Sequence, residues 1–235
     1  MRKTNRRFRR HTLMVSGAIL LLAGMCWPAE EQNLSDIAKR IDASAKVLDE
    51  VMADPSKGVP DQLIKRAQCV AVFPSMVEVA ALVGGKHGKG FISCRTSSGW
   101  SAPAPLTVTG GNWGAQFGGE QVDLVVLVMN DKGRQQLESG KFDMGVETSA
   151  VAGPVGTHHW TMNAEVVTYA RSRGLFAGTN LDGSSIAQDA DETRSLYGKS
   201  VSLADILSGK TKDPSIGQAF VSKVAAYAGN SRAQD

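Results

Sequence analysis

Aromatic residues are scarce in this chain of 235 residues, where phenylalanine, tyrosine and tryptophan together make up 6%. Glycine, with 25 copies, is frequent. Helical bundles bury apolar side chains on long helices, and glycine in a helix interior is destabilising. The composition therefore argues against a helical bundle and favours many turns and closely packed strands.

Acidic residues are missing from the first 28 positions, although six basic residues occupy the first ten. An uncharged apolar run follows at 13–25 and is too short to span a bilayer comfortably. A basic segment followed by a short apolar run is typical of a secretory signal peptide. We expect residues 1–28 to be this signal, and the chain to be exported to the periplasm or cell envelope.

The net charge of +3 comes from this leader. Without residues 1–28, 20 basic residues stand against 23 acidic ones, which gives a net charge of −3. A negative chain is a poor partner for nucleic acid, so general nucleic-acid binding is not expected.

Cysteine is rare, with three copies at 26, 69 and 94. Ala23-Gly24-Met25-Cys26 resembles a lipoprotein cleavage box, in which Cys26 would be acylated, although Met25 is larger than that box prefers. Ordinary signal cleavage near Cys26 stays open as the alternative. An oxidising compartment favours a disulfide between Cys69 and Cys94, and two buried thiols are the alternative.

Two kinds of hydrophobic spacing divide the mature chain. Residues 33–54 repeat apolar side chains at steps of three and four and precede Pro55, which predicts an amphipathic helix. From residue 69 onward, short apolar runs alternate with glycine-rich segments, as strands and turns do. Strands are expected at 69–73, 77–85, 90–95, 104–130, 142–153, 164–172, 175–181 and 184–188. Short helices are expected at 61–67, 131–139, 189–197, 202–209 and 213–229.

The strands mostly follow one another directly, which predicts an α+β fold. Its core would be an antiparallel, glycine-rich β-sheet with an N-terminal amphipathic helix and short C-terminal helices. GGKHGK at 84–89 is expected to be a tight turn between two strands. Asp182-Gly183 is expected to be a hairpin turn that gives Gly183 a positive φ.

Catalytic patterns are weak. His158 and His159 are adjacent, so on a strand they point to opposite faces and share a metal poorly. The segment from Gly178 to Ser185 has the glycine spacing of a phosphate loop but lacks its lysine. No base, nucleophile and orienting group occur together. We expect no enzymatic activity, no metal, no cofactor and no nucleotide.

The order of several motifs resembles the lipid-binding SYLF domain family. These motifs are VPDQLIKRAQCVAVFPS, a glycine-rich segment before FISCR, SSGWSAP, GAQFGGEQVDLVVLV, RGLFAGTNLDG and LYG. The match covers residues 59–198, between a helix and linker at 29–58 and a helical tail at 199–235. The family often has Ala-Gly-x-Gly where this chain has Gly110-Gly111-Asn112-Trp113, so the chain departs from it there.

The resemblance implies a non-enzymatic protein that binds membrane lipid. Eukaryotic relatives bind phosphoinositides and some bind actin, but an exported chain would meet no actin. The expected partner is therefore an anionic phospholipid membrane surface. The alternative is a structural or protein-interaction module of the envelope with no lipid preference.

Four cations are the candidate lipid-binding residues. Arg171 and Arg173 lie two apart, so on a strand they share a face and can grip a phosphate together. Lys86 and Lys89 lie in the glycine-rich segment, where backbone amides can approach an anion. The alternatives are a charge-protected edge strand and a solvated turn. For the helix at 34–52, packing against the sheet is favoured over lying on a membrane, because its polar face is not basic.

Overall fold

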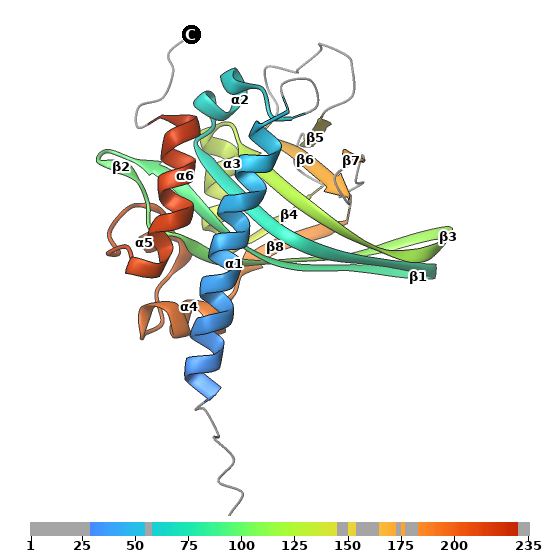
Figure 1. Ribbon diagram of the computed structural model, residues 1–235, viewed down its shortest axis with the longest axis horizontal. Coiled ribbons are helices and arrows are strands. Elements are labelled where there is room, and N and C mark those ends of the chain that lie inside the picture. Colours follow the sequence, from blue (N-terminus) through green and yellow to red (C-terminus); the bar gives the residue numbers. More distant parts are fainter. Residues whose placement is uncertain are drawn as a thin grey trace, which may run out of the picture.

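The computed structural model describes residues 29–54, 58–144, 150–153, 165–172, 175–176 and 183–229 (Figure 1). The helical elements are α1 (Ala29–Met52), α2 (Asp61–Arg66), α3 (Asp131–Glu138), α4 (Ala190–Tyr197), α5 (Leu203–Leu207), the 3₁₀ turn η1 (Ser215–Gly217) and α6 (Gln218–Ala228). The strands are β1 (Cys69–Thr96), β2 (Gly99–Trp100), β3 (Ala104–Val128), β4 (Lys141–Asp143), β5 (Ala150–Gly153), β6 (Val166–Ser172), β7 (Leu175–Phe176) and β8 (Ser184–Gln188). Among these described strands only β5 and β6 pair in parallel, so the antiparallel α+β prediction is confirmed.

The glycine-rich segment 84–89 is not a turn, and that prediction is wrong. It lies inside β1 and pairs with residues 107–112 of β3. A Cβ on Gly88 would come within 2.9 Å of the Met76 side chain, and one on Gly90 within 2.1 Å of the Val72 carbonyl oxygen. The glycines therefore let β1 bend and cross over itself instead of reversing direction.

Because β1 and β3 both bend, they divide into two halves that face each other. The first half of β1 and the second half of β3 continue into β6 and β5. The second half of β1 and the first half of β3 continue into β8 and β4. A buried core between the halves takes side chains from both, among them Phe73, Ile92, Leu106, Val126 and Phe142. The helices α3 and α5 close this core with Leu137 and Leu207.

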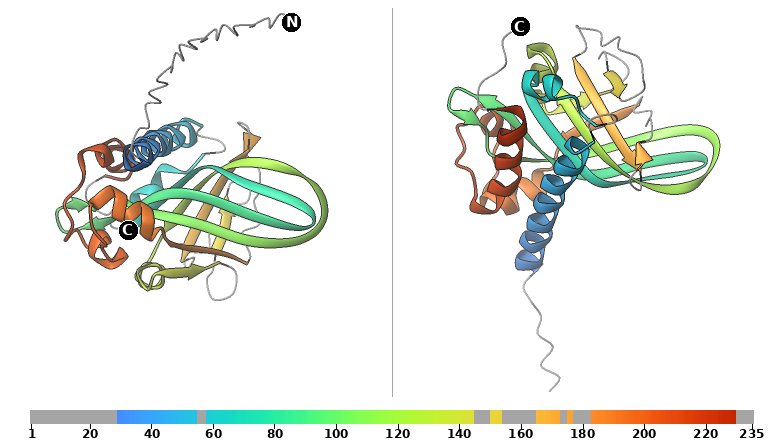
Figure 2. Two further views of the ribbon diagram at one scale, coloured as in Figure 1. Left: turned by 90° about the horizontal axis from the view of Figure 1, so that it is seen from below. Right: turned by 45° about the horizontal axis from the view of Figure 1, so that its top comes forward.

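The outer face of the first half is covered by α1 and α6, which lie side by side (Figures 1 and 2). Ile37, Ile41 and Leu48 of α1 are fully buried at helical spacing. They share a second core with Val72 and Phe220, and with other apolar residues of the sheet and α6. The apolar face of α1 therefore packs within the protein, as the sequence favoured because the polar face of the helix is not basic.

The later helices α4 and α5 begin where the sequence predicts them, and each has a side-chain cap at its N-terminus. Asp189 accepts a hydrogen bond from the Glu192 amide at the start of α4, and Ser202 accepts one from the Asp205 amide at the start of α5. Such caps satisfy amides that have no partner inside the helix. Gly183 has φ of 74°, as its predicted role requires. Residues 177–182, which include the rest of the predicted hairpin, lie outside the described part.

Candidate functional site

Arg171 lies on β6 beneath the C-terminal part of α1. Its guanidinium donates to the Asp123 carboxylate at 2.8 Å and is also paired with Glu50 of α1. Burial lowers the pKa of Arg171, but the hydrogen bonds to Asp123 and Glu50 outweigh it and raise the pKa. Arg171 is thus a structural cation that joins α1 to β3 and β6. Arg173, its predicted companion, lies outside the described residues.

Lys86 lies in the bend of β1 and is only 5% exposed. Its ammonium is 3.3 Å from the carboxylate of Glu78, eight positions earlier in the same strand. In a straight strand these positions would be about 26 Å apart, at about 3.3 Å per residue. The pair therefore spans the inside of the bend, and Lys86 does not stand at a solvated turn.

Lys89 forms ion pairs with Asp189 at 2.8 Å and with Glu192 at 3.0 Å. Arg40 of α1 donates to both oxygens of the same Glu192 carboxylate. Burial lowers the pKa of Lys89, but hydrogen bonds to the two carboxylates raise it by more. Together these residues link α1, β1 and α4.

The three described lipid-binding candidates are therefore each paired with carboxylates of the chain itself. An anionic head group would have to compete with those carboxylates for each cation. Sequence reasoning missed these partners because they are distant in the chain: Glu50 is 121 residues from Arg171, and Glu192 is 103 from Lys89. The role of these residues in lipid binding stays a prediction.

Arg95 is a structural residue that sequence reasoning passed over. Its guanidinium donates to the carbonyl oxygens of Lys65 and Ala67 at the end of α2 and of Ala228 and Gly229 at the end of α6. Helix C-termini carry unpaired carbonyls and a partial negative charge, which a cation stabilises. The same guanidinium lies 4.6 Å from the Trp100 ring centre. The Trp-bearing motif thus helps to hold two helix ends together.

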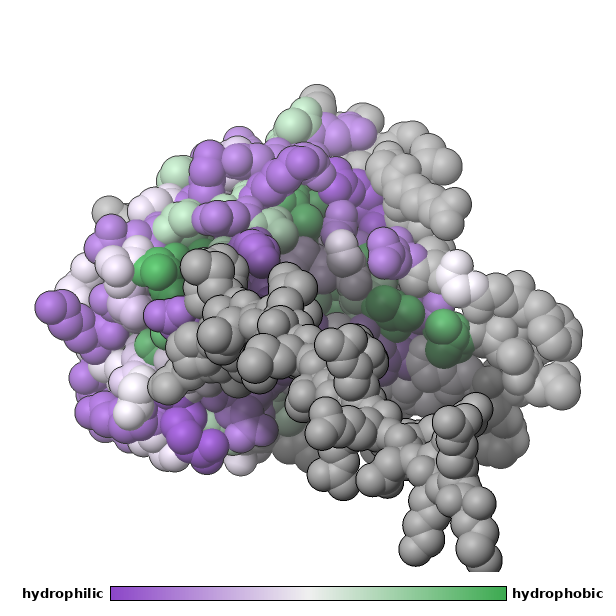
Figure 3. Space-filling model, turned by 60° about the horizontal axis from the view of Figure 1, so that its bottom comes forward, coloured by the Kyte–Doolittle hydropathy of each residue, from purple (hydrophilic) through white to green (hydrophobic). Residues whose placement is uncertain are grey.

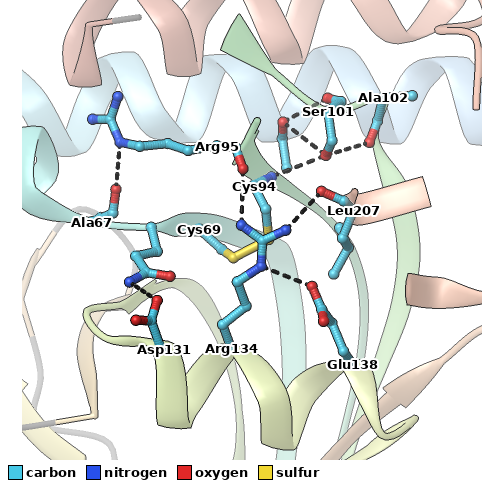
Figure 4. The surroundings of a disulfide bond; sticks show 12 residues. Ala67, Cys69, Cys94, Arg95, Ser101, Ala102, Asp131, Arg134, Glu138 and Leu207 are labelled. Atoms are coloured by element: carbon cyan, nitrogen blue, oxygen red, sulfur yellow. Dashed lines mark hydrogen bonds and ion pairs between the residues drawn. A yellow bond between two sulfur atoms is a disulfide. The ribbon is translucent and has the colours of Figure 1, made fainter. Parts of the chain in front are cut away.

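The predicted disulfide joins Cys69 and Cys94, both fully buried (Figure 4). It closes the crossing point of β1, because the two residues lie near opposite ends of that strand. Arg134 of α3 lies beside it and donates to the carbonyl oxygens of Arg95 and Leu207. The bridge and its surroundings belong to the scaffold. Cys26 lies outside the described residues.

No group of metal-ligating side chains and no helix suited to crossing a bilayer occurs in the described part of the chain. Ser184 is 1% exposed. A cavity between the two sheet halves is lined by apolar residues such as Ala71, Leu106 and Ile186. The residues that line this cavity carry no polar side chain. His158 and His159 lie outside the described residues.

Exposed apolar side chains occur where β1 and β3 bend. Val77 is 42% and Val79 is 51% exposed, and Ile216 is the other large apolar residue at the described surface. The two strands project from the body of the protein at this bend (Figures 1 and 2). Figure 3 shows hydrophobic surface toward the same side within a largely hydrophilic face. Exposed apolar side chains are unusual at such a place, because exposed edge strands usually carry protecting charges.

Comparison with known proteins identifies the family. The family described as "Las17-binding protein actin regulator", Ysc84, matches residues 109–227, half of the chain. The chain belongs to this family. The resemblance to SYLF domains read from the motifs is thereby confirmed.

Curated members of the Ysc84 family are similar over most of this chain. Human "SH3 domain-containing YSC84-like protein 1" is 31% identical over 194 residues, covering 77% of this chain and 56% of the relative. Yeast "LAS seventeen-binding protein 3" is 32% identical over 165 residues, covering 66% of this chain and 36% of the relative. The chain thus spans about half or less of the length of these relatives.

Proposed function

We propose that this Ysc84-family chain is an exported, non-enzymatic protein that binds anionic phospholipid at the membrane surface of the periplasm or cell envelope. The observation that carries the proposal is the family match at 109–227, since SYLF domains are expected to bind lipid. In the described part of the chain, the motif residues pack in the core or bond to the ends of helices. These structural roles agree with a binding protein. The basic and apolar segments before residue 26 support export.

The electrostatic part of this binding is expected to be modest. Arg171, Lys86 and Lys89 already have carboxylate partners, and the chain after residue 28 has a net charge of −3. Lys89 has the most accessible side chain of the three, at 36% exposed. Any head-group contact in the described part is therefore expected at Lys89 before Lys86 or Arg171.

Co-sedimentation with lipid vesicles tests the proposal. The chain is mixed with vesicles of phosphatidylcholine alone and of phosphatidylcholine with phosphatidylglycerol, at low and high salt. We expect more protein to pellet with phosphatidylglycerol, and part of that gain to be lost in high salt because screening weakens exposed charges. Absence of pelleting with either vesicle would contradict lipid binding.

A protein-interaction module is the second candidate. It is favoured by the names of the relatives, which describe binding to Las17 and regulation of actin. Under this alternative, an envelope protein would be the partner and vesicles would not retain the chain.

A further inference from the structure

Two lysines near the C-terminus, Lys199 and Lys212, differ from the lysines described so far. Both are exposed, and neither has a hydrogen bond or ion pair with any residue that the structure describes. By contrast, Lys39, Lys46 and Lys210 each form an ion pair with a carboxylate of the chain. An anionic ligand would therefore compete with no carboxylate of the described chain for Lys199 or Lys212.

The segment that follows α4 and the segment that precedes η1 meet at Pro103. The Tyr197 hydroxyl at the end of α4 donates to the Pro103 carbonyl oxygen at 2.7 Å. A Cβ on Gly217 would lie 2.5 Å from Oδ1 of Asp213 and 2.6 Å from Cγ of Pro103. Burial, and then the charge of Asp213, raises the pKa of Tyr197. The two segments are therefore neighbours, on the side of the sheet where α4, α5 and α6 lie together (Figures 1 and 2).

Three exposed side chains belong to this junction, and we call them the tail surface. They are Lys199, Lys212 and Ile216, each one or two positions from a residue that lies at Pro103. Ile216 is 36% exposed, although it is a large apolar residue. The tail surface thus combines two unpaired cations of the described chain with an exposed apolar side chain.

The acidic residues of this region leave the two lysines unneutralised. Asp205 is paired with Lys210 at 3.3 Å. Oδ1 of Asp213 is buried on the side of Gly217, and the described chain has no ion pair between Asp213 and Lys212. Residues 198–217 contain three lysines and two aspartates. This segment is therefore positive, although the chain after residue 28 is negative.

We propose that the tail surface docks the chain on an anionic phospholipid membrane, with Lys199 and Lys212 at the phosphate groups and Ile216 in the interfacial layer. The proposal rests on the proposed lipid-binding function and deepens it. A lysine near an anionic surface strengthens binding about fivefold, and this gain falls with salt. Burial of an apolar side chain adds a contribution that does not depend on charge.

The chemistry of the tail surface favours a membrane over other anionic partners. A membrane presents phosphates and an apolar layer together, which is the complement of two lysines beside an isoleucine. Nucleic acid supplies phosphates without that layer, and its binding needs many cations. Three side chains are also far fewer than the roughly 20–30 residues per side of a stable protein interface.

The cationic part is tested with the intact chain and phosphatidylcholine–phosphatidylglycerol vesicles at low salt. The double variant Lys199→Gln, Lys212→Gln should partition about tenfold more weakly than the unchanged chain. The matched control is Lys39→Gln, Lys46→Gln, which removes the same charge from α1, where these side chains are 71% and 77% exposed. It should partition nearly as the unchanged chain does. Circular dichroism establishes that both variants are folded.

The apolar part is tested at high salt, where the lysines are screened. Ile216→Ser should partition about threefold more weakly, from loss of a partly exposed apolar side chain. Ile216→Trp should partition more strongly, because tryptophan favours the membrane–water interface. The matched control Val79→Ser changes a more exposed apolar residue of β1 and should have no effect. Unchanged partitioning of both Ile216 variants would contradict the apolar contact.

Two comparisons separate this proposal from lipid binding in general and from a site for free phosphate. If the unchanged chain binds vesicles but the two lysine variants lose equal affinity, the tail surface is overturned and lipid binding stands. If the unchanged chain binds no vesicle, both are overturned. Sodium phosphate and sodium chloride of equal ionic strength should release the chain equally. Stronger release by phosphate would indicate a site for the free anion and would contradict docking on the membrane.

Discussion

The surroundings of Asp213 suit its negative charge poorly. Its Oδ1 is buried without a hydrogen-bond partner and lies 2.5 Å from where a Cβ on Gly217 would be. Burial raises the pKa of this carboxyl to about 6. The folded protein therefore binds a proton at Asp213 more tightly than the unfolded chain does.

The raised pKa gives a signed prediction. Between about pH 6 and pH 4 the folded state holds this proton and the unfolded state does not, so Asp213 favours folding more as the pH falls through this window. Asp213→Asn, which stays neutral, should raise the free energy of unfolding at pH 7 by about 1–2 kcal/mol. The gain should vanish near pH 4. Urea unfolding at both pH values measures it.

Asp205→Asn is the matched control. A hydrogen bond from Ser202, and then Lys210, lowers the pKa of Asp205. Its replacement should therefore reduce stability at pH 7, opposite in sign to Asp213→Asn. A loss of stability in Asp213→Asn at pH 7 would show that its carboxylate is stabilising and would contradict the account.

At the scale of elements, α1 is fixed to the rest of the fold by charges as well as by its apolar face. Arg40 pairs with Glu192 of α4, Asp49 with Lys223 of α6, and Glu50 with Arg171 of β6. These contacts make α1 part of the body formed by the sheet and α6.

Arg171→Ala should destabilise the protein, because it leaves Glu50 and Asp123 close together without their shared cation. We expect a loss of about 2 kcal/mol, between the values for exposed and for fully buried pairs. Lys46→Ala removes the other, 77% exposed partner of Glu50 and should cost less than about 0.5 kcal/mol. Denaturant unfolding compares them, and equal losses would refute the structural role of Arg171.

The disulfide is expected to stabilise the crossing of β1. Cys69 and Cys94 are 25 positions apart, and closing a loop of this size limits the unfolded chain by about 3 kcal/mol. Cys94→Ala should lower the free energy of unfolding by about this amount, and a reducing agent should then have no further effect. Labelling of both thiols in denatured, unreduced protein would show that the bridge does not form.

The sequence predicted most elements because their signals are local. The spacing of Ile37, Ile41 and Leu48 marks one helix face, and Ser202 marks the start of α5. The bend of β1 was mistaken for a turn because glycine clusters permit both. The contacts that decide between a bend and a turn are distant in the sequence. They are the pairing of Lys86 with Gly110 and the contact of Gly88 with Met76. The ion-pair partners of Arg171 and Lys89 were missed for the same reason.

At the scale of the whole molecule, the described part of this Ysc84-family chain pairs the candidate cations Arg171, Lys86 and Lys89 with its own carboxylates. The predicted cationic site is spread over separate ion pairs in the described part of the chain, so binding should depend on both charge and apolar contact. A purely electrostatic membrane binder would instead lose its affinity in salt.

The most direct test of the central claim is a titration of the intact chain with vesicles, at low and high salt, that yields a partition coefficient. Lipid binding predicts saturable partitioning that increases from phosphatidylcholine to phosphatidylcholine–phosphatidylglycerol and keeps a salt-resistant part. A partition coefficient indistinguishable from zero for both vesicles at low salt would contradict the claim that this chain binds membrane phospholipid.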